Sequence, residues 1–195
     1  MQLHGTPLSH FTRKIRILSA ELAIPVEFVS TKSVMATAPA AYADNPLMRI
    51  PTLVDGATTV IDSDHIARYL VGRFDAADRL GVRSERVDDL NRLAVTSGVM
   101  ANEVVLILAK RGGLEDIESV GYFQKLMAAI DAGLAWLDQK VEPEAPGFDY
   151  RDIALVCMWQ HLAHYGLRPL TPYARIAARV ERFADRPSVA PSTPH

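Results

Sequence analysis

Residues 50–63 read Ile-Pro-Thr-Leu-Val-Asp-Gly-Ala-Thr-Thr-Val-Ile-Asp-Ser and contain the strongest local signal in this 195-residue chain. Two short β-prone runs, 51–54 and 58–61, flank Asp55-Gly56, a pair that is typical of tight hairpin turns. The stretch therefore predicts two antiparallel strands. Apolar residues at helical spacing follow directly, and Ser63 is well placed as the N-cap of that helix.

The residues before this hairpin alternate between strand-like and helix-like patterns. After a strand-like opening run, apolar side chains recur at helical spacing until Pro25 ends the helix. Residues 26–29 alternate as a strand does, whereas 31–45 predict a loop with a short helix. The order is therefore β-α-β, a loop, and β-β-α, which predicts an α/β layer structure.

The second half of the chain has no strand signal and predicts a bundle of helices. The first two helices are expected at about 84–111, where Gly112-Gly113 follows, and at about 120–140. Residues 151–164 are apolar nearly all round, which is typical of the buried central helix of a bundle.

The last helix is predicted to begin with Thr171 as N-cap and Pro172 at its first position, and to end before Arg186. The proline-rich tail after it is predicted to be extended. Because the composition changes from mixed α/β to all-α, we expect two domains. Their predicted bounds are 1–75 and 84–187, with a linker at 76–83 and a tail at 188–195.

The composition narrows the classes of protein to which the chain could belong. Apolar residues make up 49%, and the net charge is −2 with both signs scattered, so no basic field for nucleic acid is present. The longest purely apolar run, 153–159, is far short of a bilayer span. Neither a signal peptide nor a disulfide partner for Cys157 is evident, so we expect a cytoplasmic protein without a membrane partner.

Ser9-His10-Phe11-Thr12 lies where the first helix begins, at the spacing of the C-x-x-C motif of thioredoxin-like domains. At such a position, unpaired backbone N–H groups and the helix dipole favour an anion. A serine there can donate a hydrogen bond to the thiolate of a ligand and so lower the pKa of that thiol. The alternative is that Ser9 only caps the helix, and the local sequence alone favours the cap.

Two further sequence patterns can each be interpreted in two ways. Pro51 is either an ordinary edge-strand start or a cis-proline, which would turn the backbone of Ile50 toward an extended peptide. Asp62-Ser63 is either an N-cap or a holder for an α-amino acid group, with the acid on the ammonium and the hydroxyl on the carboxylate. Asp64 would oppose carboxylate binding if it pointed inward, so we expect it to point outward.

Taken together, these patterns make the chain resemble the cytosolic glutathione transferases, in particular the serine-type enzymes of bacteria. The resemblance rests on Ser9–Lys14, on residues 45–53, and on Asp62-Ser63-Asp64-His65-Ile66, which matches an acidic-Ser-x-x-Ile pattern. It implies a thioredoxin-like N-terminal domain followed by an all-helical C-terminal domain. Asp149-Tyr150-Arg151-Asp152 resembles the helix-capping box of that second domain.

The resemblance also implies roles for particular residues. Ser9 would stabilise the thiolate of glutathione, with Phe11 packed beside it. The cysteinyl backbone would bind at Ile50, with Pro51 cis, and Arg49 would reach the glycine carboxylate. The γ-glutamyl end would be held by Asp62 and Ser63. On the first long helix, Ser97, Met100 and Asn102 are candidates for an electrophile pocket, although core packing explains Met100 equally well.

The implied activity is conjugation of glutathione to a small apolar electrophile by a homodimer, with detoxification as the role. The alternatives are a non-catalytic binding protein of the same fold and a dimeric scaffold. His161-x-x-His164 has metal-ligand spacing, but no third ligand is evident in the sequence, so we expect no metal and glutathione as the only cofactor. Cys157 is expected to be an inert core residue.

Overall fold

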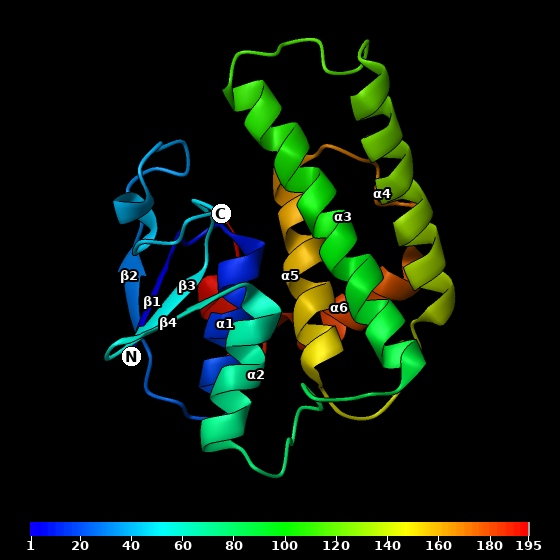
Figure 1. Cartoon of the computed structure of the whole chain (residues 1–195). Coiled ribbons are helices and arrows are strands. Elements are labelled where there is room, and N and C mark those ends of the chain that lie inside the picture. The colour runs from blue at the N-terminus through cyan, green and yellow to red at the C-terminus, as the bar shows by residue number, and fades with distance from the viewer. Residues whose placement is uncertain (195) are drawn as a thin grey trace.

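The computed structural model describes residues 1–194 and contains a four-stranded sheet and six α-helices. Helices α1 and α2 lie between the sheet and the bundle formed by the other helices, as Figure 1 shows. In chain order the α/β part comprises β1 (Gln2–Gly5), α1 (His10–Glu21), β2 (Glu27–Ser30), the short 3-10 helix η1 (Pro39–Tyr42), β3 (Thr52–Asp55), β4 (Thr58–Ile61) and α2 (Ser63–Phe74). The helical part comprises α3 (Val87–Arg111), α4 (Gly121–Lys140), α5 (Tyr150–Tyr165), α6 (Ala174–Ala184) and the 3-10 helix η2 (Ala190–Ser192).

The sheet has the strand order β2-β1-β3-β4. Strands β1 and β2 are parallel, whereas β3 is antiparallel to both β1 and β4. The predicted hairpin is confirmed, and Gly56 in its turn has a φ of +59°, a conformation that costs glycine little. The thioredoxin-like domain with a helical partner is therefore the observed architecture, while the domain bounds stay a prediction.

One face of the sheet forms a core with α1 and α2. Leu3 and Leu53, which are paired across β1 and β3, are almost completely buried, as are Ile15 on α1 and Leu70 on α2. Burial of such side chains stabilises each by about 1.5–3 kcal/mol. This packing fixes α1 and α2, at whose N-terminal ends Ser9, Asp62 and Ser63 lie.

Helix α5 is the central helix of the bundle, as predicted, and it contacts α1, α3 and α6. The capping box is also confirmed: the Asp149 carboxylate accepts from the N–H of Arg151 and Asp152, and Asp152 accepts from the N–H of Asp149. Helix α3 is long and apolar enough, by length and composition alone, to cross a membrane, yet here it packs along α4 and α5.

Two predictions about the C-terminal region are wrong. Helix α6 begins at Ala174 rather than after Thr171, because Asp138 of α4 accepts hydrogen bonds from the N–H groups of Arg175 and Ile176 at 2.9 Å. A side chain that is distant in sequence thus supplies the cap. Over residues 188–194 the tail is not extended: it contains η2, and Val189 is completely buried. Residue 195 of the predicted tail lies outside the described residues.

Candidate active site

Ser9 lies at the N-terminus of α1 and is half-buried. Its Oγ accepts a hydrogen bond from the N–H of Thr12 at 3.2 Å, so the cap expected from the local sequence is present. A hydroxyl also carries one proton of its own, which this contact leaves free for donation. Ser9 can therefore cap the helix and bind a thiol at the same time.

The end of β1 and the first turn of α1 are in close contact. A Cβ atom on Gly5 would lie 2.4 Å from the Thr12 Oγ1, and Thr12 is completely buried. Only glycine fits at this position without displacing the Thr12 side chain. Gly5 and Thr12 thus set where Ser9 lies relative to the sheet. Phe11 is half-buried beside Ser9, with its ring centroid 5.8 Å from the Lys14 Nζ.

The Ile50–Pro51 peptide bond is cis, as the resemblance implied. The loop before it is held by Asn45, whose side-chain amide donates to the carbonyl oxygen of Arg49 at 2.8 Å and accepts from the N–H of Leu47 at 2.9 Å. Pro51 is buried, whereas the Arg49 side chain is exposed to solvent. The Arg49 side chain is thus accessible to a carboxylate, while its backbone carbonyl is held by the Asn45 amide.

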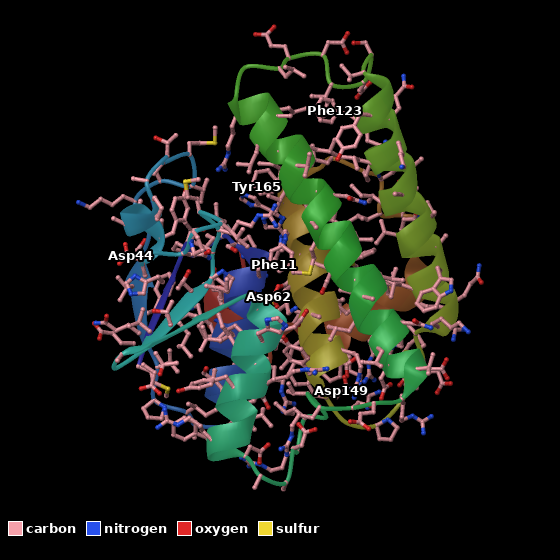
Figure 2. The ribbon with its side chains drawn as sticks, viewed as in Figure 1. Phe11, Asp44, Asp62, Phe123, Asp149 and Tyr165 are labelled. Carbon is pink, nitrogen blue, oxygen red and sulfur yellow. The ribbon has the colours of Figure 1, made fainter. Side chains whose placement is uncertain are left out.

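The start of α2 differs from the prediction by one residue. Asp62, not Ser63, is the N-cap: its Oδ1 accepts from the N–H groups of Asp64 at 2.8 Å and His65 at 3.2 Å. Asp62 takes a φ of +73°, and Ser63 becomes the first, buried residue of the helix. Both residue types are good caps, so only the backbone conformation decides between them. The Asp62 side chain is exposed at the junction of the two domains (Figure 2).

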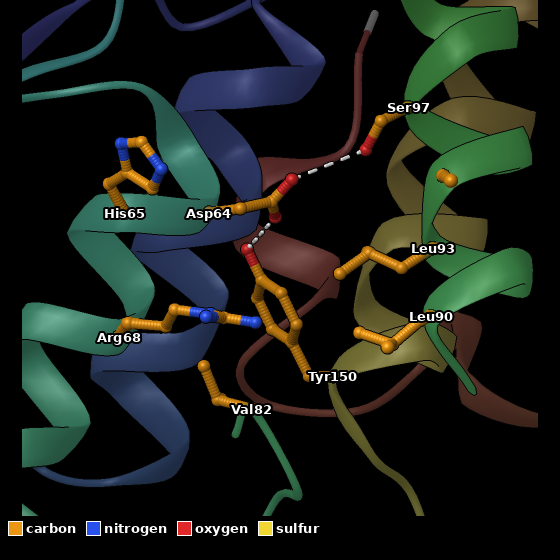
Figure 3. Close-up of a pocket in the computed structure, with 9 residues that line it drawn as sticks. Asp64, His65, Arg68, Val82, Leu90, Leu93, Ser97 and Tyr150 are labelled. Carbon is orange, nitrogen blue, oxygen red and sulfur yellow. Dashed lines mark hydrogen bonds between the residues drawn. The ribbon is translucent and has the colours of Figure 1, made fainter. Parts of the chain in front are cut away.

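The expectation that Asp64 points outward is wrong. Its Oδ1 lies 2.7 Å from both the Lys14 Nζ and the Tyr150 hydroxyl, and its Oδ2 accepts from the Ser97 hydroxyl at 3.4 Å. Figure 3 shows Asp64 directed from α2 toward Tyr150 and Ser97. A fully buried lysine requires a counter-charge, and this requirement turns Asp64 inward.

The surroundings of Asp64 determine its ionisation. Burial raises the pKa of this carboxyl, but the Lys14 charge and the hydrogen bonds from Lys14, Tyr150 and Ser97 outweigh burial and lower the pKa overall. Asp64 therefore remains a carboxylate at neutral pH. It joins α1, α2, α3 and α5, so it organises the junction and does not lie free in the site.

A pocket of about 300 Å³ lies beside this network, between α2 and α3 (Figure 3). Its wall includes Leu90, Leu93 and Ser97. Of the three residues predicted to line an electrophile pocket, only Ser97 faces this space. Met100 is completely buried in the core, and Asn102 is half-buried further along α3.

Three titratable groups that sequence reasoning did not connect also meet at the domain junction. His10 of α1, Glu103 of α3 and His161 of α5 are all buried, and each offers a ligand atom within 4.8 Å of the others. Burial, followed by the nearby charges of His161, Lys14 and Arg13, lowers the pKa of His10 well below its usual range. His164, the expected companion of His161, is exposed and lies outside this group.

Comparison of the sequence with family models identifies the N-terminal part of the chain. Residues 3–78 match the model described as the glutathione S-transferase N-terminal domain. This domain belongs to the glutathione S-transferase family. Among curated proteins, none matches the chain in sequence.

Solved glutathione transferases resemble the chain over its whole length. A glutathione transferase family member from Pseudomonas fluorescens Pf-5 with bound glutathione has a TM-score of 0.86 at 25% identity, covering 100% of this chain and 98% of that one. A glutathione S-transferase from Methylobacillus flagellatus KT with glutathione bound has a TM-score of 0.82 at 24% identity, covering 100% and 99%. Maleyl pyruvate isomerase, a bacterial zeta-class member, has a TM-score of 0.74 at 20% identity, covering 99% and 96%. The glutathione transferase fold therefore extends through the helical domain.

Proposed function

We propose that this protein is a glutathione S-transferase of the serine type, which transfers a small apolar electrophile to the thiolate of glutathione. Ser9 is the residue that activates the thiol: its hydroxyl proton stabilises the thiolate while its oxygen caps α1. The supporting observation is this free donor at a helix N-terminus, in a domain that belongs to the family. The bound glutathione in two relatives points the same way.

The remaining contacts follow from the positions of the predicted residues. Ile50 binds the cysteinyl backbone beside Pro51, while Arg49 is accessible to the glycine carboxylate. The exposed carboxylate of Asp62 pairs with the γ-glutamyl ammonium, and Ser63, whose N–H the Asp62 cap does not use, binds the carboxylate. These contacts hold the thiol at Ser9 and so reduce the entropic cost of reaching the transition state.

The protein is further proposed to act as a cytoplasmic homodimer. Val87 and Leu90 at the start of α3 are 69% and 40% exposed, although both are large and apolar. A second copy of the chain that covers this end of α3 would remove them from water. Sedimentation of the purified protein at assay concentrations tests this state, and a monomer would contradict it.

The first experiment is a calorimetric titration with reduced glutathione, followed by an electrophile panel. We expect one glutathione per chain and measurable turnover. Binding without turnover on the whole panel would indicate a ligand-binding protein instead. Absence of binding at millimolar glutathione would indicate a scaffold and overturn the proposal.

Three substitutions at Ser9 separate capping from thiol activation. Ser9→Thr keeps both functions, Ser9→Asp keeps a cap but cannot donate a proton when ionised, and Ser9→Ala loses both. A hydrogen bond to a charged group contributes about 1.5–3 kcal/mol, which corresponds to about one to two units in the pKa of the bound thiol. We expect Ser9→Ala and Ser9→Asp to raise that pKa, read from thiolate absorbance, and to cut turnover about 10- to 100-fold.

In the same series, stability should follow a different order. Ser9→Ala should destabilise the protein by about 1 kcal/mol, whereas Ser9→Asp and Ser9→Thr should remain close to the parent. If Ser9→Asp retains full turnover, Ser9 is only a cap and its proposed role is wrong.

A further inference from the structure

The domain junction contains a cluster of three buried side chains that the proposed transferase reaction does not use. His10 comes from α1, Glu103 from α3 and His161 from α5. The Glu103 Oε2 lies 2.9 Å from the His161 Nδ1 and 3.7 Å from the His10 Nδ1. The two imidazole rings are perpendicular, with centroids 4.0 Å apart. The three groups therefore converge on one point.

Polar atoms in this cluster lack hydrogen bonds. Both ring nitrogens of His10, both carboxylate oxygens of Glu103 and the His161 Nδ1 are buried without a partner of normal hydrogen-bond geometry. The 2.9 Å contact between Glu103 and His161 is thus close but misdirected. A buried carboxylate without compensation is costly, and the same holds for a buried imidazole nitrogen. A cation that attracts several of these lone pairs at once would remove this cost.

The other buried carboxylates of the protein show how this cost is normally met. Asp75 is paired with Arg79, and Asp152 is paired with Arg179 through two hydrogen bonds. Within residues 1–194, no lysine or arginine forms an ion pair with Glu103, whose side chain is completely buried. Among the described residues, the titratable side chains that act on Glu103 are histidines: His161 and His10 in contact with it, and His164 at longer range. The missing partner is therefore a cation that can be bound by nitrogen as well as oxygen.

We propose that His10, Glu103 and His161 bind one divalent transition-metal ion, with zinc as the best fit. Two imidazole nitrogens and one carboxylate oxygen are a known zinc ligand set. A tetrahedral zinc ion holds its ligand atoms about 3.4 Å apart. The distances from the Glu103 Oε2 to the two histidine nitrogens, 2.9 Å and 3.7 Å, lie on either side of that value. The nitrogen ligands disfavour magnesium and calcium, which prefer oxygen.

The ion would link the two domains. Its ligands come from one helix of the N-terminal domain and two helices of the bundle, so loading it fastens α1 to α3 and α5. Aromatic rings enclose the cluster: Phe11 lies 4.6 Å from the His10 ring and Tyr165 lies 4.8 Å from the His161 ring, and both are labelled in Figure 2. Because His10 directly follows Ser9, the ion would also fix the start of the helix that Ser9 caps.

The first test uses the tag-free protein, stripped with a chelator and then titrated with zinc chloride. We expect one zinc per chain by calorimetry and by elemental analysis. At a zinc concentration a hundredfold above the dissociation constant, the Tm should rise by about 5–10 °C. Absence of uptake at the cluster, or uptake that leaves the Tm unchanged, would overturn the proposal.

Variants locate the ion. Glu103→Gln and His161→Asn each remove one ligand, so zinc affinity should fall by more than the 10- to 100-fold that loss of an outer partner costs. His164→Asn is the matched control, because His164 is on the same helix one turn away and is exposed. If His164→Asn abolishes uptake, or if the two ligand variants retain it, the bound zinc lies on the surface and the proposal is wrong.

A second readout does not depend on affinity. In the stripped protein, Glu103→Gln removes an uncompensated carboxylate and should leave the Tm equal to or above that of the parent. In excess zinc the order should reverse, since only the parent gains from the ion. If the variant has the same Tm offset from the parent in both states, no ion is held by Glu103.

Discussion

Replacement of Asp64 by asparagine should destabilise the domain junction strongly. The carboxylate accepts from Lys14 and Tyr150 at 2.7 Å each and from Ser97 at 3.4 Å. Its loss leaves the Lys14 ammonium, which has no exposed surface, without a counter-charge. Breaking one side of a buried ion pair costs about 3–5 kcal/mol.

The lower end of that range applies here. The Asp64 side chain is 29% exposed, so solvent already screens part of the interaction, and an asparagine oxygen can still accept from Lys14. We therefore expect Asp64→Asn to lower the unfolding free energy by about 3 kcal/mol. For a chain of this size, that corresponds to a Tm decrease of about 6–12 °C.

The pH dependence gives the prediction a second check. The pKa of Asp64 is lower in the folded protein than in the unfolded chain, so its contribution is complete above the unfolded value of about 3.9. It is lost as the pH falls through the folded value. Urea unfolding of the parent and of Asp64→Asn should differ by a constant amount from pH 5 to pH 8, and the gap should close in acid.

Lys14→Met is the matched control for this substitution. It removes the cation instead, and leaves Asp64 with two hydroxyl partners and some solvent, so it should cost less than Asp64→Asn. The double variant should be more stable than the sum of the two single effects predicts. A typical surface substitution changes the unfolding free energy by less than about 0.5 kcal/mol. If Asp64→Asn changes it by no more than that, the network does not stabilise the junction.

Two further substitutions test the packing around the site and the central helix. Gly5→Ala would place a Cβ 2.4 Å from the Thr12 Oγ1, so thermal unfolding should show a loss of stability of about 1–3 kcal/mol. Adding Thr12→Ala to the same chain should restore most of that stability, and no rescue would mean that the clash is elsewhere. Asp152→Asn leaves the buried guanidinium of Arg179 without its carboxylate and weakens the capping box of α5, so urea unfolding should show a loss of about 3–5 kcal/mol, and an unchanged midpoint would refute it.

Local signals predicted the elements that local interactions determine. The hairpin around Asp55-Gly56, the end of α3 at Gly112-Gly113 and the capping box at Asp149 depend on residues within a few positions of one another. The start of α6 could not be predicted in this way, because its cap comes from Asp138 on α4. A competing local signal at Thr171-Pro172 was present and was not used by the fold.

The residues of the candidate site show the same contrast between local and long-range determinants. Ser9 and Pro51 could be placed because each acts through its own backbone position, a helix N-terminus or a cis bond. Asp64 could not, because its direction depends on Lys14, fifty residues earlier, and on Tyr150, far later in the chain. The spacing of His161 and His164 drew attention to the correct helix but to the wrong companion, since His161 meets residues of two other helices.

The junction therefore contains two carboxylates with different partners, Glu103 fully buried and Asp64 partly exposed, and this difference makes the two proposals separable. Asp64 already has a cation and hydroxyl donors, so neutralising it should destabilise the protein whether or not metal is present. Among the described residues, Glu103 has imidazole neighbours and no paired lysine or arginine, so neutralising it should destabilise the protein only when an ion is bound there. A reaction that brings a thiol from one domain to an electrophile held by the other requires a fixed junction. Comparing Asp64→Asn with Glu103→Gln, with and without zinc, would show whether charge pairing alone fixes it or whether a metal ion completes it.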